Sequence, residues 1–192
     1  MKIAIFGGAF DPITTGHVHV VNEVLNVVDH VIVMPCYKHA FDKQMTNAID
    51  RLMMCKLAFL HNPKVEVSDY EIDNKTSGKT IEKINDLKVN YPADSLSWVI
   101  GLDNAYDIIK WYQWESLIKS IPFIVVPREG YSSTENNWYL SSPHILLKCK
   151  PVLMSSSMIR ELFAAKNYDK LKELLHPLIY AYIFYNKLYG VQ

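Results

Sequence analysis

The sequence predicts an α/β fold in which a parallel sheet is covered by helices on both faces. Short apolar runs alternate along the chain with longer segments of helical periodicity. Nearly every residue in the short runs is apolar, which is typical of strands buried on both faces of a parallel sheet. A chain of 192 residues suits one core, and no repeat or linker interrupts the pattern. We therefore expect a single domain over residues 1–192, with C-terminal helices from about residue 156.

The short apolar runs are the expected strands. Gly7 and Gly8 stop the first run, and Pro35 stops the second. In chain order the strands are Lys2–Phe6, His30–Met34, Val65–Val67, Leu96–Ile100, Phe123–Val126 and Ile145–Leu147.

The longer segments predict helices, because their apolar residues recur three or four positions apart. Asn47 is the expected N-cap of the second helix, and Pro92 stops the third. Gly130–Ser142, which is rich in Ser, Asn and Tyr, is the expected loop. In chain order the helices are His17–Val28, Asn47–Leu60, Lys79–Tyr91, a mostly helical Asn104–Ser120, Ser156–Lys166, Asp169–Leu175 and Leu178–Tyr189.

Balanced charge and sparse cysteines argue against several classes of protein. Lys plus Arg and Asp plus Glu each number 20, whereas nucleic-acid binders usually carry a basic surplus, so we expect no nucleic acid polymer as partner. The three cysteines form no CxxC pair, which predicts reduced thiols. The apolar N-terminal run is too short for a signal peptide, and no apolar stretch is long enough for a membrane span. We expect a cytoplasmic protein that contacts no membrane.

Ligands of such a sheet bind beyond the carboxyl ends of its strands, so the segment Gly7–His17 after the first strand is informative. Gly7 and Gly8 let a phosphate approach the backbone, and the helix that begins near Gly16 directs free N–H groups toward it. His17 then lies in the first helical turn, where it could donate to a phosphoryl oxygen. The segment is neither a GxGxxG fingerprint nor a GxxxxGK[ST] loop. Two glycines and a histidine alone would favour a tight strand-to-helix turn with a surface histidine over a phosphate site.

The complete string GGxFDPxxxGH, which includes Ala9 and Phe10, resembles the nucleotidyltransferase superfamily, and specifically nicotinate/nicotinamide mononucleotide adenylyltransferases. The resemblance implies a Rossmann-like sheet of the nucleotidyltransferase type. That family usually shows HxGH where this chain has Thr14-Thr15-Gly16-His17. Thr at the first position resembles phosphopantetheine adenylyltransferase instead, and its hydroxyl could still bind a phosphate.

Further motifs follow in the family's order. Gly101-Leu102-Asp103-Asn104, followed by Trp111, resembles its GxD segment and tryptophan-bearing helix, and Met154–Arg160 is similar to its ISSTxIR motif. Pro35–Lys43 resembles its second substrate loop, and Gly78-Lys79-Thr80-Ile81 loosely resembles its pyridine-contacting segment.

The resemblance implies transfer of AMP from ATP to nicotinate or nicotinamide mononucleotide, forming deamido-NAD or NAD and pyrophosphate. It implies catalytic roles for His17, Thr14, Lys43 and Arg160. It implies ATP contacts at Gly7, Gly8, Ala9, Phe10, Gly16, Gly101, Asp103, Ser155, Ser156 and Ser157. It implies contacts with the pyridine mononucleotide at Thr80, Trp111 and His39.

Mg²⁺ is the implied cofactor, bridging the phosphates of ATP, because the chain offers no all-protein cage for a metal. The choice between nicotinate and nicotinamide stays open. Two alternatives, both motivated by Thr14, are a phosphopantetheine adenylyltransferase and a nucleotide-binding sensor without catalysis. Exposed tyrosines on the last helix would permit a homo-oligomer.

Overall fold

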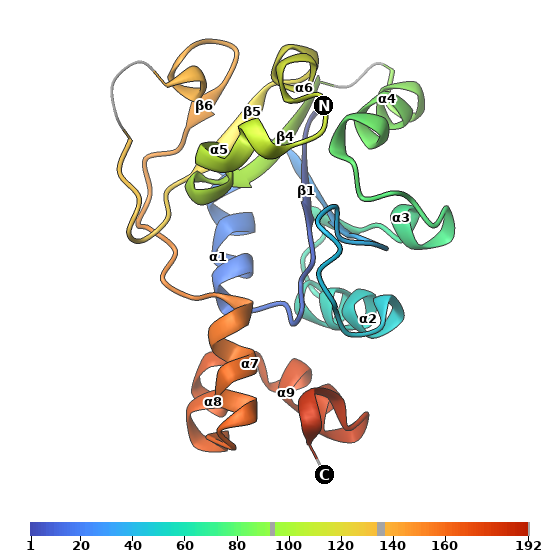
Figure 1. Ribbon diagram of the computed structural model, residues 1–192, viewed down its shortest axis with the longest axis vertical. Helices are drawn as coiled ribbons and strands as arrows, with labels where there is room; N and C mark the ends of the chain where they lie inside the picture. The colour runs from blue at the N-terminus through green and yellow to red at the C-terminus, as the bar shows by residue number, and fades with distance from the viewer. Residues whose placement is uncertain (93–94, 134–136, 192) are drawn as a thin grey trace.

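The computed structural model describes residues 1–92, 95–133 and 137–191. Its strands form one sheet in the order β3-β2-β1-β4-β5-β6 (Figure 1), and all neighbours pair in parallel. The strands are β1 (Lys2–Gly8), β2 (His30–Pro35), β3 (Val65–Val67), β4 (Ser95–Gly101), β5 (Phe123–Val126) and β6 (Ile145–Leu146). The predicted α/β fold with a parallel sheet is confirmed.

Helices cover both faces of the sheet (Figure 1). They are α1 (Thr15–Val24), α2 (Ala48–Ala58), α3 (Tyr70–Asp73), α4 (Thr80–Asn90), α5 (Leu102–Asp107), α6 (Trp114–Ser120), α7 (Ser156–Ala164), α8 (Tyr168–Leu174) and α9 (Pro177–Tyr185). Three short 3₁₀ helices are η1 (Ile108–Lys110), η2 (Trp138–Leu140) and η3 (Leu188–Gly190).

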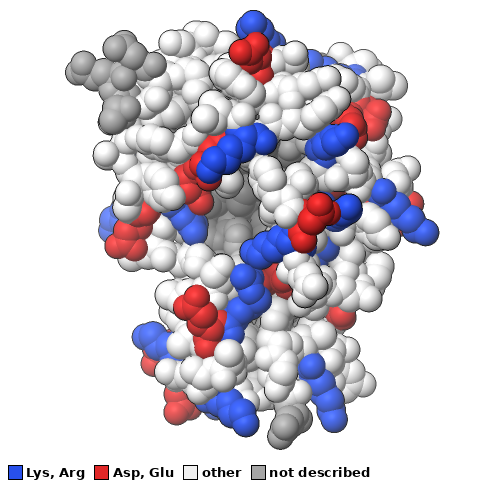
Figure 2. Space-filling view, viewed as in Figure 1, with Lys and Arg blue, Asp and Glu red and all other residues white. Residues whose placement is uncertain are grey.

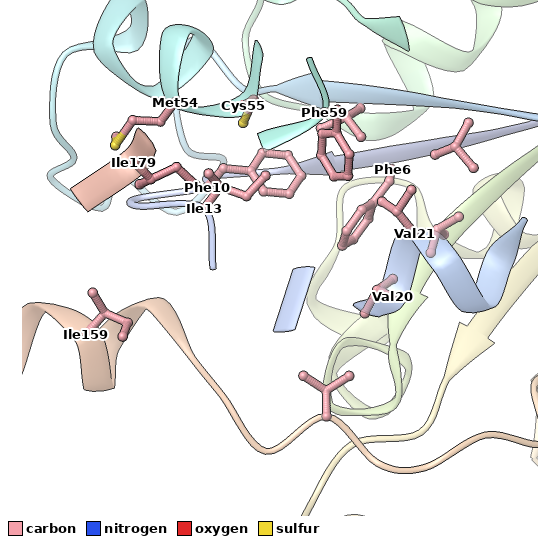
Figure 3. Close-up of a cluster of buried hydrophobic side chains, with 14 of the residues drawn as sticks. Phe6, Phe10, Ile13, Val20, Val21, Met54, Cys55, Phe59, Ile159 and Ile179 are labelled. Carbon is pink, nitrogen blue, oxygen red and sulfur yellow. The ribbon is translucent and has the colours of Figure 1, made fainter. Parts of the chain in front are cut away.

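Side chains of β1 alternate between two hydrophobic cores. Ala4 and Phe6 join the core under α1, α2 and α7–α9, whereas Ile3 and Ile5 join the core under α4–α6. In the first of these cores, Phe10 and Ile13 of the loop after β1 lie with Met54, Ile159 and Ile179 of three helices (Figure 3). The loop that leads from β1 to α1 is therefore packed into the interior.

The helices differ from the prediction at two places where the backbone turns left-handed. The segment Asn104–Ser120 is divided into α5, η1 and α6, with Gln113 at φ +51° before α6. The last predicted helix ends at Tyr185, and Lys187 at φ +52° precedes η3. In these stretches, the helical periodicity of the sequence predicts which side chains are buried. It does not predict where one short helix ends and the next begins.

Smaller differences concern ends and short elements. Asn47 caps α2 as expected, with its side chain accepting from the Ile49 N–H at 2.8 Å. The four-residue helix α3 was not predicted, and η2 lies in the expected loop Gly130–Ser142, of which residues 134–136 lie outside the described residues. Within the described part of the chain, none of the helices is both long and apolar enough to cross a bilayer.

Candidate active site

Two cavities meet at the carboxyl ends of β1 and β4. The strand order changes direction between these two strands, which is the place where open α/β sheets bind ligands. The cavities measure about 250 and 600 Å³. Their shared wall is made by Phe6, Gly7, Gly8, Ala9, Gly101 and Asn104. Figure 2 shows basic side chains across the middle of one face, beside a hollow in the surface.

The smaller cavity is lined by all the residues predicted to bind ATP. Segments far apart in the sequence contribute His17, Asp103 and Arg160 to one lining. The lining also includes Gly7, Gly8, Ala9, Phe10, Gly16, Lys43, Ser155, Ser156 and Ser157. The sequence-predicted residues are thus brought together, with the exception of Thr14.

His17 presents a neutral imidazole to this cavity. Its Nδ1 accepts from the Thr14 N–H at 3.0 Å and lies 2.9 Å from the Thr14 hydroxyl. Burial, with a smaller effect from the Arg128 charge, lowers the pKa of His17 to about 4. Because Nδ1 accepts a hydrogen bond, the single proton of the neutral ring resides on Nε2. His17 can therefore donate from Nε2 without carrying a charge at neutral pH.

Thr14 is the N-cap of α1, and its side chain is fully buried. Its hydroxyl accepts from the His17 N–H and faces the His17 ring, and together they form a capping box. Thr14 is absent from the residues that line the smaller cavity. The structure therefore places Thr14 behind His17, where it orients the imidazole, and gives its hydroxyl no surface toward a phosphate.

The start of α7 is held against the loop after β1. Ser155 caps the helix by accepting from the Met158 N–H, and the Ser156 hydroxyl donates to the Pro12 carbonyl at 2.9 Å. Arg160 donates to the Asp11 carbonyl at 2.6 Å and to the Ser157 hydroxyl at 3.0 Å. These contacts keep the Arg160 guanidinium at the edge of the smaller cavity, with donors left for an anion.

Asp103 lies in the first turn of α5, directly after β4. A Cβ at Gly101 would come within 2.3 Å of the Asp103 Oδ1, so the close approach of this carboxylate requires glycine. Asp103 Oδ2 lies 3.8 Å from Nε of Arg128, which follows β5. Arg128 also lines the smaller cavity, and the motif matches missed it. Its position after the fifth strand was the available signal, since that loop lies at the ligand-binding edge.

The larger cavity receives the residues predicted for the pyridine mononucleotide. Thr80, Trp111 and His39 all line it. Gly78, at φ +83°, packs so closely on the loop after β2 that a Cβ would lie 2.4 Å from the Lys38 carbonyl oxygen. This contact joins the segment before α4 to the loop that carries His39. The larger cavity is thus lined by polar residues from α4 and from the loop after β2, together with Trp111.

A buried ion pair includes Lys83, which lines the larger cavity. Lys83 Nζ lies 2.7 Å from Glu71 Oε1, and both side chains are almost fully buried. The Thr76 hydroxyl donates to the other Glu71 oxygen at 2.8 Å. Motif matching gave no signal for this pair, because its partners lie on different helices.

Arg51 of α2 belongs to an RxxM sequence that resembles part of the family's second substrate loop, but the sequence predicted no role for its side chain. Its side chain is 1% exposed and donates to three backbone carbonyls. Nη1 reaches Ala9 at 2.7 Å, Nη2 reaches Cys36 at 2.7 Å, and Nε reaches Thr46 at 2.9 Å. Arg51 therefore clamps the loop after β1 to both ends of the loop after β2.

Comparisons with known proteins agree on one family. Residues 5–162 match the model of the family described as Cytidylyltransferase-like. The "Probable nicotinate-nucleotide adenylyltransferase" of Caldicellulosiruptor saccharolyticus is 35% identical over 98% of this chain and 99% of its own length. The "Nicotinate-nucleotide adenylyltransferase" of Bacillus subtilis is 34% identical over 86% of this chain and 87% of its own.

A solved structure is similar over the whole chain. The Plasmodium falciparum nicotinic acid mononucleotide adenylyltransferase complexed with NaAD superimposes with a TM-score of 0.87 at 25% identity. The match covers 100% of this chain and 98% of the Plasmodium chain.

Proposed function

The chain belongs to the nicotinate-nucleotide adenylyltransferase family, and from this premise we propose that it transfers AMP from ATP to nicotinate mononucleotide. The products are deamido-NAD and pyrophosphate. The observation that carries the proposal is the pair of cavities with a shared glycine wall, because a triphosphate and a second nucleotide can meet there. Relatives named for the nicotinate substrate support the acid form over the amide.

In the proposed reaction the acceptor's phosphate is the nucleophile. A phosphate monoester has a second pKa of about 6 and is mostly dianionic at neutral pH, so no general base is required. One of its oxygens forms a bond to the α-phosphorus of ATP while the bond from that phosphorus to the bridging oxygen breaks. Pyrophosphate leaves with that oxygen and the electron pair. The enzyme's tasks are alignment and stabilisation of negative charge.

The smaller cavity is assigned to the phosphates and ribose of ATP. Nε2 of His17 donates to an α- or β-phosphoryl oxygen as charge moves toward the leaving group, and the N-terminus of α1 adds its partial positive charge. Arg160 binds the triphosphate end. Lys43 supports the pyrophosphate or the incoming phosphate. Asp103 accepts from the ribose hydroxyls. Arg128, which the structure adds to this set, supplies a further cation beside Asp103.

The larger cavity is assigned to the pyridine mononucleotide. Trp111 offers an aromatic face on which a pyridine ring can stack, and Thr80 and His39 offer polar contacts. Three of the six residues in the shared wall, Gly7, Gly8 and Gly101, have no side chain. The acceptor phosphate can therefore approach the α-phosphorus closely along this part of the backbone.

We assign Mg²⁺ to the phosphates of ATP. Among the described residues no group of three or more His, Cys, Asp or Glu side chains could hold a metal ion. A magnesium ion bound with ATP would neutralise phosphate charge. Lys43, Arg128 and Arg160, which line the smaller cavity, would supplement that charge.

Pyrophosphate release with alternative acceptors tests the proposal. The purified protein, ATP and Mg²⁺ would be assayed with nicotinate mononucleotide, nicotinamide mononucleotide and phosphopantetheine in turn. We expect the highest kcat/KM with nicotinate mononucleotide and formation of the dinucleotide in equal amount to pyrophosphate. Preference for phosphopantetheine, or binding of ATP without turnover on any acceptor, would overturn it.

A further inference from the structure

The buried carboxylate of Asp11 joins three segments around the smaller cavity. Asp11 is 2% exposed. Its Oδ2 accepts from the Thr46 N–H at 3.2 Å, and its Oδ1 accepts from the Tyr189 hydroxyl at 2.7 Å. Its backbone carbonyl accepts from Arg160 at 2.6 Å. A single residue is thus held by the loop after β2, by α7 and by η3.

Two of these contacts, those with Thr46 and with Arg160, connect Asp11 to cations of the proposed site. Thr46 ends the loop that carries Lys43, and Arg160 itself lines the smaller cavity. A displacement of Asp11 would therefore move Arg160 and the loop of Lys43 together. The phosphates of ATP would then lose the alignment of two cations together.

Tyr189 is the third contact, although it lies 178 positions from Asp11 in the sequence. Its ring stacks on Phe163 of α7, with centroids 5.4 Å apart and an interplanar angle of 23°, so the hydroxyl is aimed by packing. Helices α7 to α9 lie together at one end of the molecule, below β1 in Figure 1. A phenol fixed in this way directs one strong donor at a carboxylate that is cut off from water.

We propose that Tyr189 is a positioning residue for adenylyl transfer, which acts through Asp11 on Arg160 and on the loop of Lys43. The inference rests on the proposed function, because it assigns these two cations to the phosphates. Tyr189 touches no substrate in this scheme. Its hydroxyl sets the place of Asp11, and Asp11 sets the places of the groups that bind the triphosphate.

Burial next to the Asp11 carboxylate raises the pKa of Tyr189 well above its usual value of 10. The phenol therefore remains a donor throughout the pH range in which the enzyme can be assayed. Removal of the hydroxyl would leave the Asp11 carboxylate with the Thr46 N–H as its remaining donor within the described part of the chain.

The variant Tyr189→Phe tests the proposal, because it keeps the ring stacked on Phe163 and removes only the hydroxyl. We expect kcat to fall about tenfold and KM for ATP to rise, since small misplacement of binding groups is costly for the transition state. KM for the pyridine mononucleotide should stay within about twofold of wild type. Tyr185→Phe is the matched control, because Tyr185 is 87% exposed on α9, and it should behave as wild type.

A double-mutant cycle with Arg160→Ala separates positioning from a general loss of folded enzyme. If Tyr189 acts partly through Arg160, the fold-effect of Tyr189→Phe on kcat/KM for ATP should shrink clearly in the Arg160→Ala background. Full multiplication of the two effects contradicts the proposal. So does a folded Tyr189→Phe enzyme with wild-type kcat and KM. A fall in the active fraction with unchanged KM for ATP would assign Tyr189 to folding alone.

The wild-type enzyme serves as the reference for the function itself. If wild type forms no dinucleotide, the proposed function fails, and binding of a non-hydrolysable ATP analogue then tests Tyr189 independently. Weaker binding in Tyr189→Phe than in Tyr185→Phe would still support its link to the phosphate-binding groups. Equal binding in the two variants would overturn the inference.

Discussion

At the scale of single residues, the arrangement of Thr14 and His17 accounts for a departure from the family's usual HxGH. Thr14 has a structural role, because it caps α1 and its hydroxyl lies within hydrogen-bond distance of Nδ1 of His17. The substitution therefore leaves the second histidine oriented toward the cleft. In the proposed mechanism, His17 is therefore the one histidine assigned to the phosphates, beside the nearby cations.

Replacement of His17 by alanine should lower turnover far more than ATP affinity. The Nε2 contact is expected to strengthen as charge grows on the phosphates, and loss of one such donor costs about 100- to 1000-fold in kcat. The dissociation constant for an ATP analogue should change by no more than a few fold. Steady-state kinetics and calorimetry would measure both quantities. His19→Ala, on the same helix and outside the cavity linings, is the control, and an unchanged kcat in His17→Ala would falsify the role.

The low pKa of His17 also predicts how stability depends on pH. The pKa is about 4 in the folded chain and 6.5 in its reference state. Between pH 6.5 and 4, His17 is therefore protonated in the unfolded chain and remains neutral in the folded chain. Stability should fall through that window, by at most about 3 kcal/mol from this group. Urea unfolding of wild type and His17→Gln at pH 7 and pH 4.5 would show it, because the variant should lose less stability. Parallel losses in the two proteins would contradict the assignment.

Gly101→Ala should separate folding from ATP binding. The added Cβ meets Oδ1 of Asp103 at 2.3 Å, and that atom is the free end of a side chain. The carboxylate can rotate away, so we expect the melting temperature to change little. KM for ATP should rise toward the value of Asp103→Ala, because both variants lose the ribose contact. A wild-type KM in Gly101→Ala would show that Asp103 has no such role.

At the scale of elements, α2 organises the site without contributing a residue to the phosphate cavity. Arg51 holds three carbonyls from the loops after β1 and β2. Arg51→Gln leaves at least two buried carbonyls without donors, each of which costs about 1–3 kcal/mol. We expect destabilisation of about 3 kcal/mol, measured by urea unfolding, together with loss of activity.

Two further variants sharpen the interpretation of Arg51. Arg51→Lys keeps the charge but lacks the planar fork, so its stability should lie between those of Arg51→Gln and wild type. Lys56→Gln changes an exposed cation of the same helix, 3.7 Å from Asp69, and should cost less than about 1 kcal/mol. Equal stability of Arg51→Gln and Lys56→Gln would refute the clamp.

The elements also show which parts of the fold the sequence could predict. The strands were predictable because residues such as Ile3, Ala4 and Ile5 are all buried in a parallel sheet, which leaves an unbroken apolar run. The break before α6 was not, because Gln113 adopts a left-handed conformation without a glycine to mark it. Helix α3 has only four residues, Tyr70–Asp73, which is too short for a periodic pattern.

At the scale of the whole molecule, the site joins the two halves of the sheet. Its cavities lie between β1 and β4, and their linings come from both sides of that boundary. Motif order predicted His17, Asp103 and Arg160 as one group. It could not predict Arg128, Asp11 or Tyr189, because their roles depend on contacts between distant segments.

A ligand that spans both cavities should stabilise the entire fold. Deamido-NAD at 100 times its dissociation constant is expected to add about 2.7 kcal/mol of stability, which for a chain of this size corresponds to a rise in melting temperature of about 5–10 °C. Differential scanning fluorimetry would measure the shift. Nicotinate mononucleotide, which is assigned to one cavity, should bind more weakly and therefore produce a smaller rise when the two ligands are compared at equal concentration. A dinucleotide that left the melting temperature unchanged would contradict the assignment of the cavities.

The glycine wall between the two cavities also limits how this protein could become resistant to an inhibitor. A side chain at Gly7 would come within 2.7 Å of the buried Trp98 ring, and one at Gly101 would displace Asp103. A compound that makes its contacts with this wall binds to backbone, which mutation cannot replace. Escape by substitution at the wall would therefore sacrifice the packing or the substrate contact on which the protein itself depends.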